Sequence, residues 1–180
     1  MRPDTDDAYL VARAQDGYLD AFELLVKRYT SLCYRVAYRL TGNHHDAQDI
    51  TQDSLTAAWE ALPRFRPQAA FPTWLYRIVT RRALNKLTRT RVAETADLLD
   101  AVPDRSHEPA GVVERGHTVD AVSAAITALP LPQRVAVVLH HLEGLPYTEV
   151  AAITGATVPA VRSHLFRARR TLGATLAEWR

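Results

Sequence analysis

The chain has 180 residues, of which 47% are hydrophobic, and its formal net charge is only +2. This composition is typical of a soluble globular protein with one domain or two small ones. No apolar run reaches the length of a membrane span, and the acidic start MRPDTDDAYL is not expected to act as a secretion signal. A single cysteine, Cys33, excludes an internal disulfide framework and fits a reducing cytoplasm.

The first 45 residues predict two helices. A short helix is expected from Thr5 to Gln15, capped by Asp4 or Thr5 and ended at Gly17. A longer helix carries apolar residues at three- and four-residue spacing from Phe22 to Leu40, and Gly42-Asn43 ends it. Cys33 lies on the apolar side of this pattern, so we expect it to be a buried small hydrophobic residue.

The next predicted helix, residues 46–62, is acidic. It contains no Lys or Arg, and Asp46, Asp49 and Asp53 share one face because they lie three and four residues apart. Favourable charge at a helix start explains Asp46 but not Asp53, which lies nearly two turns in. The pattern therefore favours an acidic surface that docks on a basic partner.

The stretch from Arg64 to Arg91 combines positive charge with aromatic rings. Pro63 and Pro67 interrupt the helical pattern, which resumes near Phe71, and the stretch contains no Asp or Glu. Its basic residues are Arg64, Arg66, Arg77, Arg81, Arg82, Lys86, Arg89 and Arg91, and its rings are Phe65, Phe71, Trp74 and Tyr76. Positive charge attracts phosphate, and aromatic faces stack on unpaired bases, so this surface suits a single-stranded nucleic acid. The alternative is a solvated basic helix whose aromatic residues belong to the core.

Residues 92–116 have a different composition. Acidic residues return, and Pro103, Pro109, Gly111 and Gly116 interrupt any long helix. We expect a flexible acidic linker, with at most a short helical turn near Leu98-Leu99.

Four apolar patterns after residue 117 predict a second helical domain. The inward residues of its first two helices are Val119, Val122, Ile126, Leu129, Val135, Val138, Leu139 and Leu142. A short helix then ends at Gly155. The inward residues of the last helix are Val161, Leu165, Ala168 and Leu172. The outward arginines of this last helix are Arg162, Arg167, Arg169 and Arg170. A short helix, a glycine turn and a basic helix have the spacing of a helix-turn-helix, whose second helix enters the major groove.

Three motifs occur in order along the chain. The segment DAQDITQD at residues 46–53 runs on to Ala58-Trp59, and FR at 65–66 precedes Phe71 and TWLYRI at 73–78. LEGL at 142–145 is followed by VRS at 161–163 and FRAR at 166–169. These motifs resemble, respectively, the polymerase-binding helix, the −10 segment and the −35 domain of the sigma-70 family of bacterial transcription initiation factors. The chain is most similar to the extracytoplasmic-function group (group 4) of that family.

The resemblance implies an all-α fold with two small helical domains. A four-helix N-terminal bundle (1–91, region 2) and a C-terminal four-helix domain with a helix-turn-helix (117–180, region 4) would be joined by the flexible acidic linker (92–116). It implies a cytoplasmic, non-enzymatic factor without cofactor or metal. An anti-sigma protein would control it and could hold it at the membrane, without direct membrane insertion of the chain. No domain like region 1.1 is expected, which separates the chain from housekeeping members.

The resemblance also assigns site residues. The partner would be core RNA polymerase, through its clamp helices and flap, and the residues of the acidic helix that dock on the clamp helices would be Asp46, Asp49, Gln52 and Asp53. Contact with the −35 duplex would involve Arg162, Ser163, His164, Phe166, Arg167, Arg169 and Arg170. Capture of the single-stranded −10 element of promoter DNA, with a base flipped near the Pro67–Phe71 loop, would involve Arg64, Phe65, Arg66, Phe71, Trp74, Arg77, Arg81, Arg82 and Asn85.

Three positions depart from the family pattern. Arg81 stands where many relatives carry Asn, Pro159-Ala160 replaces a common Gly-Thr, and His164 replaces a common Arg or Lys. Proline suits a first helical turn, so we expect the architecture to persist. We expect promoter preference to change instead.

Three other functions remain as alternatives. A plain helix-turn-helix repressor would account for residues 118–180 but would leave the first bundle without a role. A metal enzyme is suggested by the pairs His44-His45 and His140-His141, but adjacent helical side chains point about 100° apart and no Cys or acidic cluster is expected to join them. A non-catalytic helical adaptor is disfavoured by the acid-free basic stretches.

Overall fold

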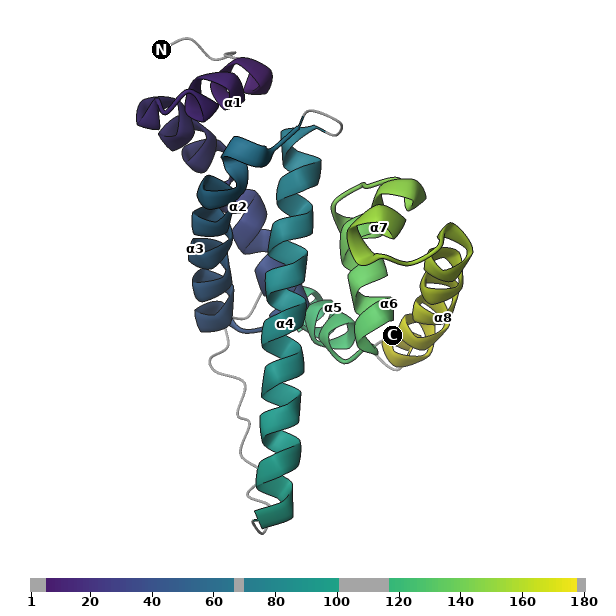
Figure 1. Cartoon of the computed structure of the whole chain (residues 1–180). Coiled ribbons are helices and arrows are strands. Elements are labelled where there is room, and N and C mark those ends of the chain that lie inside the picture. The colour runs from purple at the N-terminus through teal and green to yellow at the C-terminus, as the bar shows by residue number, and fades with distance from the viewer. Residues whose placement is uncertain (1–5, 67–69, 101–116, 178–180) are drawn as a thin grey trace.

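The structure is a computed structural model that describes residues 6–66, 70–100 and 117–177, with side chains described in 6–66, 70–90 and 121–177. Within these ranges every regular element is helical, as the sequence predicts, and the helices form two groups (Figure 1). None of the described helices combines the length and the hydropathy that crossing a bilayer requires.

The N-terminal group consists of α1 (Asp7–Gln15), α2 (Leu19–Thr41), α3 (His44–Ala61), a 3₁₀ turn η1 (Leu62–Arg64) and α4 (Phe71–Asp100). Asp6 caps α1 by accepting a hydrogen bond from the backbone N–H of Ala8, so the predicted caps Asp4 and Thr5 were wrong. Asn43 caps α3 in the same way. Gly42 ends α2 with a φ of 70°, a left-handed conformation that glycine adopts without strain.

The core of this group is built around α2. Its residues Val36 and Leu40 are fully buried, as are Leu75 and Val79 of α4. The small residues of α3, such as Ala58, allow the helix backbones to approach closely. Cys33 is also fully buried, which raises the pKa of its thiol to about 12, so it is the unreactive hydrophobic residue that the pattern predicts.

Helix α4 is the longest helix of the chain and extends past Arg91 to Asp100 (Figure 1). The prediction that the linker begins at residue 92 was therefore wrong for its first nine residues. The segment VAETADLLD consists mostly of residues that favour helix, and the first breaker is Pro103. The rest of the predicted linker, residues 101–116, lies outside the described ranges.

The C-terminal group consists of α5 (His117–Thr127), α6 (Leu131–Ala136), a π-helical segment η2 (Val137–Leu142), α7 (Tyr147–Thr154) and α8 (Val158–Ala177). Most predicted inward residues are buried, but Leu142 is 39% exposed and Val122 is 36% exposed. The wider π turn changes the angular position of Leu142 relative to an ideal α-helix. Nothing in the structure explains the exposure of Val122.

The two groups pack against each other, an arrangement that the sequence left open. Helix α4 lies beside α7, and α2 contacts α5 and η2 (Figure 1). A Cβ atom at Gly42 would lie 2.9 Å from Cγ2 of Thr127, so the Thr127 side chain of α5 packs closely on the backbone at the end of α2. Arg134 donates from Nη1 to the Leu40 carbonyl at 2.7 Å, and burial lowers the pKa of its guanidinium. Two carbonyl groups of its own domain, those of Thr127 and Leu129, also accept from Arg134.

Candidate polymerase and nucleic-acid interfaces

The last helix, α8, presents a basic outer face. Val161, Leu165 and Ala168 are buried beneath it. The exposed residues of the predicted −35 set are Arg162, Phe166, Arg167, Arg169 and Arg170. Phe166 is 62% exposed, so an apolar ring lies among guanidinium groups, which suits contact with a thymine methyl group beside phosphates.

Two other residues of the predicted −35 set lie closer to the protein interior. Ser163 and His164 are half-buried. His164 lines a pocket of about 200 Å³ together with Leu84 of α4 and residues of α6 and α7. In this arrangement of the domains, the imidazole therefore faces a neighbouring helix, and its predicted contact with DNA stays a prediction.

The helix-turn-helix also carries an aromatic and cationic stack. His140 stacks on Tyr147 with ring centroids 4.3 Å apart, and Arg162 lies 5.4 Å from the centroid of the same tyrosine. His141 lies beside them, and burial, together with the charges of His140 and Arg169, lowers its pKa. The stack brings His140, Tyr147 and Arg162 together and gives His140 a structural role.

The aromatic residues of the Arg64–Arg91 stretch belong mainly to the core. Phe65 and Phe71 are only 9% and 5% exposed, and their rings lie 4.8 and 5.6 Å from that of Trp74. Their rings are largely covered, which agrees with the alternative that places them in the core, and their contact with the −10 strand stays a prediction. Trp74 itself is half-buried. The loop next to these rings, residues 67–69, lies outside the described ranges.

The polar residues of the predicted −10 set lie at the surface of the protein. The exposed members are Arg64, Arg66, Arg77, Arg81, Arg82 and Asn85. The sequence did not point to Gln15, whose side-chain amide donates to the carbonyl groups of Leu62 and Phe65 at 2.9 and 2.8 Å. Gln15 thereby holds the turn that leads into this surface.

The acidic face of α3 pairs with the basic face of α4. Nζ of Lys86 lies 3.0 Å from Asp46 and 3.9 Å from Asp49, and Nη1 of Arg82 lies 3.9 Å from Asp53. The hydrogen bond to Asp46 and its charge raise the pKa of Lys86. These pairs explain the position of Asp53, which helix-start electrostatics did not. The side chains of Asp49 and Asp53 are still 50% and 66% exposed, so they remain accessible to a partner.

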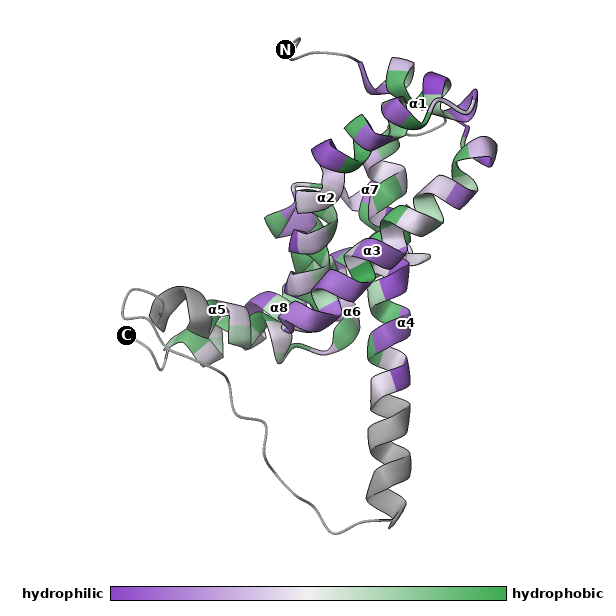
Figure 2. Cartoon of the chain, turned by 90° about the vertical axis from the view of Figure 1, so that its left-hand side faces the viewer, coloured by the Kyte–Doolittle hydropathy of each residue, from purple (hydrophilic) through white to green (hydrophobic). Residues whose placement is uncertain are grey.

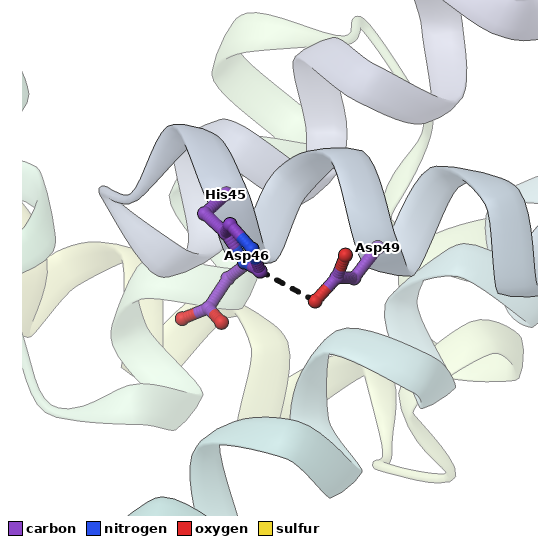
Figure 3. A group of neighbouring side chains, drawn as sticks. All are labelled: His45, Asp46 and Asp49. Carbon is purple, nitrogen blue, oxygen red and sulfur yellow. Dashed lines mark ion pairs between the residues drawn. The ribbon is translucent and has the colours of Figure 1, made fainter.

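His45, Asp46 and Asp49 form the one group in the described residues with the spacing of metal ligands (Figure 3). Their ligand atoms lie within 4.8 Å of one another, contrary to the expectation that no acidic residues join the histidine pair. Nδ1 of His45 lies 3.3 Å from Asp49, and Lys86 supplies a positive charge to both carboxylates. Because exposed carboxylates with a cationic neighbour need no metal, we assign these residues to ion pairing.

A groove of about 490 Å³ lies between α2 and α3. It is lined by Thr30, Ser31, Tyr34, Gln48, Thr51, Gln52 and Leu55. Gln52 belongs to the predicted polymerase-binding set, and Asp49 and Asp53 flank it in the sequence. The sequence did not predict this groove because its two walls come from different helices.

One carboxylate, that of Glu143, joins the two domains. Its side chain is 1% exposed and accepts hydrogen bonds from Arg35, Arg39 and Tyr76. Burial acts to raise the pKa of Glu143, but the hydrogen bonds from Arg35 and Tyr76 and the charges of the two arginines outweigh it and lower the pKa. A second contact, from the Thr73 hydroxyl to Glu149, lies nearby at 3.1 Å.

We expect acid to weaken the packing of the two domains. A carboxyl group whose pKa is lowered by its partners stabilises the packed state above its ordinary pKa of about 4.3, and this contribution is lost as pH falls through the lowered pKa. Energy transfer between dyes on Glu60→Cys and Ala174→Cys, both exposed positions, measures the packing. The difference in energy transfer between this protein and its Glu143→Gln derivative should stay constant from pH 8 to about 5 and vanish in stronger acid. A difference that instead changes near neutral pH would contradict the assignment.

Comparison with known proteins agrees with the geometry. Sigma-70 region 2 matches residues 25–92, and Sigma-70 region 4 matches residues 120–172. The ECF RNA polymerase sigma-E factor of Escherichia coli (strain K12) is 34% identical over 96% of this chain and 95% of its own length. ECF RNA polymerase sigma factor SigE of Mycolicibacterium smegmatis is 32% identical over 97% of this chain and 68% of its own length.

Two solved structures have a similar fold. CnrH in complex with the cytosolic domain of CnrY matches with a TM-score of 0.71 and 30% identity, over 96% of this chain and 97% of that chain. The sigma factor RpoE of Bartonella quintana, in complex with the anti-sigma factor NepR, matches with a TM-score of 0.69 and 26% identity, over 87% and 96%. The chain therefore belongs to the extracytoplasmic-function group of the sigma-70 family and is a promoter-directing transcription initiation factor, not an enzyme.

Proposed function

We propose that this chain binds core RNA polymerase with its N-terminal domain and reads promoter DNA with both domains. The observation that carries the proposal is the presence of two exposed arginine surfaces on separate helices, α4 and α8, in one chain. Figure 2 shows hydrophilic residues along the outer faces of the helices in both groups. In this proposal residues 1–91 act as region 2 and residues 117–180 act as region 4, with residues 92–116 joining them.

The C-terminal domain is proposed to bind the −35 element as duplex. Helix α8 follows α7 and the Gly155 turn, which is the order of a helix-turn-helix. Arg162 and Arg167 lie about 1.4 helical turns apart and would contact base edges or phosphates, and Phe166 would contact a thymine methyl group.

The N-terminal domain is proposed to capture the −10 strand after it unpairs. The exposed arginines of α4 and η1 would hold its phosphates. The half-buried Trp74 offers the remaining aromatic edge, which Phe65 and Phe71 support from below. In this proposal only the Trp74 ring stacks on a base, and the rings of Phe65 and Phe71 support it.

The acidic edge of α3 and its groove are proposed to dock on the clamp helices of the polymerase. Asp49, Gln52 and Asp53 are exposed on α3, and Gln52 also lines the groove between α2 and α3. The carboxylates would attract basic residues, and the groove would receive apolar side chains of a partner helix. A contact between the flap and the C-terminal domain would complete the complex.

An anti-sigma protein is proposed to control this factor in the cytoplasm. The similar folds of CnrH and of the B. quintana RpoE were solved with CnrY and with the anti-sigma factor NepR. A membrane-bound partner of this kind would hold the chain at the membrane without any insertion of the chain itself.

Reconstituted run-off transcription tests the proposal. Core polymerase mixed with the purified chain and a genomic DNA library should produce transcripts from a limited set of start sites. Sequencing upstream of those sites should return paired −35 and −10 elements. Transcripts that are no more abundant than those made by core polymerase alone would exclude the function.

The substitution Trp74→Ala is expected to impair promoter opening but to spare polymerase binding. Loss of base–aromatic stacking is worth about 1–3 kcal/mol per base, and α3 does not contain this residue. Permanganate reactivity of unpaired thymines should fall, and the conservative substitution Trp74→Phe should restore part of it. Because Trp74 also packs on Phe65, the thermal unfolding of each variant is needed as a control. Normal permanganate reactivity in a folded Trp74→Ala protein would exclude the stacking role.

A further inference from the structure

Three donors from two helices surround the buried carboxylate of Glu143. Arg35 donates from Nε at 2.8 Å and from Nη2 at 2.6 Å, one bond to each carboxylate oxygen. The Tyr76 hydroxyl donates at 2.8 Å, and Nη1 of Arg39 completes the set. The sequence did not indicate this site, because Arg35 and Glu143 are 108 positions apart.

All three donors belong to the N-terminal domain, whereas the acceptor belongs to the C-terminal domain. Arg35 and Arg39 lie on α2, Tyr76 lies on α4, and Glu143 follows η2. Separation of the domains would therefore remove the carboxylate and leave the two guanidinium groups and the hydroxyl in place. The side chains of Arg35 and Arg39 are already 45% and 31% exposed, so the site would open directly to solvent.

The chemistry of these donors also suits a phosphodiester. A guanidinium fork binds the two oxygens of a carboxylate and the two non-bridging oxygens of a phosphate in the same bidentate manner. Both groups carry one negative charge, and two arginines face that charge here. Tyr76 belongs to α4, the helix that also carries Arg77 and the other exposed arginines of the proposed −10 surface.

We propose that Arg35, Arg39 and Tyr76 form a binding site for a backbone phosphate of single-stranded promoter DNA, and that Glu143 occupies this site as an internal substitute while the two domains are packed together. The inference rests on the proposed function, because the strand would reach this site from the −10 surface. DNA and the packed C-terminal domain then compete for the same three donors. The Thr73–Glu149 contact makes the competition stronger, because it covers another part of α4.

A simple interdomain ion pair is the other interpretation of the same contacts. Buried ion pairs often add little to stability, so the contacts by themselves do not distinguish the two. The two interpretations differ in whether Arg35 and Arg39 contribute to DNA binding once Glu143 has been replaced. If they only hold the domains together, then removing them after Glu143 has been removed should not affect DNA binding.

The test measures binding of the full-length chain to a fluorescent single-stranded 20-mer of random sequence, without polymerase. A random pool is suitable because phosphate contacts do not depend on sequence. The variants are Glu143→Gln, Glu143→Ala, and Glu143→Gln combined with Arg35→Gln and Arg39→Gln. The matched control combines Glu143→Gln with Arg13→Gln, because Arg13 lies on α1 and stacks on Tyr18. Dyes on Glu60→Cys and Ala174→Cys report domain separation, since the buried thiol of Cys33 is protected from labelling.

Removal of the carboxylate is expected to tighten binding about tenfold at low salt, as one phosphate contact becomes available. Replacing Arg35 and Arg39 in that background should abolish the gain and reduce the slope of log affinity against log salt by about 0.7. The Arg13 control should bind like Glu143→Gln alone. Two results would overturn the proposal: unchanged affinity in both single Glu143 variants, or undiminished affinity after the arginines are replaced.

A parallel measurement keeps this inference separate from the proposed function. The unaltered chain is tested with core polymerase in run-off transcription. Failure there would count against the proposed function itself. Normal transcription, together with oligonucleotide binding that does not change when Glu143, Arg35 and Arg39 are replaced, would exclude only the proposed phosphate site.

Discussion

Replacing Asp49 and Asp53 together by arginine is expected to abolish binding to core RNA polymerase. Both side chains are at least half exposed on α3, on the face that pairs with α4, and Gln52 of the same helix lines the groove between α2 and α3. The double substitution changes the local charge by four units, since two negative charges become two positive ones. A basic partner surface would then meet repulsion, and like charges placed together at an interface cost several kcal/mol. Co-purification of the variant with core polymerase measures the effect. Competition with a labelled copy of the unaltered chain for the polymerase is an alternative measurement.

Unfolding is not expected to explain that loss. The two carboxylates pair with Lys86 and Arg82 at 3.9 Å, and exposed pairs of this kind contribute about 0–1 kcal/mol each. Thermal unfolding should confirm that the double variant folds. Glu60→Arg supplies a matched control, because Glu60 is exposed near the other end of the same helix. Polymerase binding that persists in the Asp49→Arg, Asp53→Arg protein would refute the docking surface.

Replacing Arg162 and Arg167 together by alanine is expected to eliminate specific binding of the −35 duplex. Each base contact that is lost should cost about 1–3 kcal/mol, so the loss of two base contacts should lower the affinity by about thirtyfold or more. Titration of labelled duplexes, with and without the −35 element found by transcription, measures both affinity and specificity.

Salt dependence separates the two roles that these arginines can have. Replacing an arginine that contacts phosphate should weaken binding to every duplex and reduce the slope of log affinity against log salt by about 0.9. Replacing an arginine that contacts a base should weaken binding only to duplexes that contain the −35 element. Arg13→Ala, on α1 far from the helix-turn-helix in sequence, should leave both quantities unchanged. Specific binding that survives the double substitution would contradict the assignment of α8 as the reading helix.

The elements and the family could be predicted from residues close together in the chain. Helical periodicity placed the buried sides of α2 and α8, and Gly42 and Gly155 marked turns that need a left-handed residue. Exposed arginines could be predicted because an amphipathic helix keeps its charged side in water. The boundary of α4 was missed because a run without breakers leaves the end of a helix undetermined.

The roles of the aromatic and acidic residues were harder to predict. A ring among arginines has the same sequence pattern whether it stacks on a base or fills the core. Phe65 and Phe71 fill the core because they pack on each other and on Trp74, and Phe71 also meets Tyr29 of α2. Likewise, the sequence showed an acidic helix and a basic helix but not that they neutralise each other through Lys86 and Arg82.

The sequence by itself determined the helical fold, the order of the motifs and the basic face of α8, because each depends on spacing within one helix. Only the tertiary structure decided which charges remain available to partners. Arg35, Arg39 and Glu143 meet across two domains, and contacts over about a hundred residues leave no local pattern. The arginines of α2 were therefore unremarkable in the sequence, whereas in the folded chain they surround the best-buried carboxylate at the domain interface.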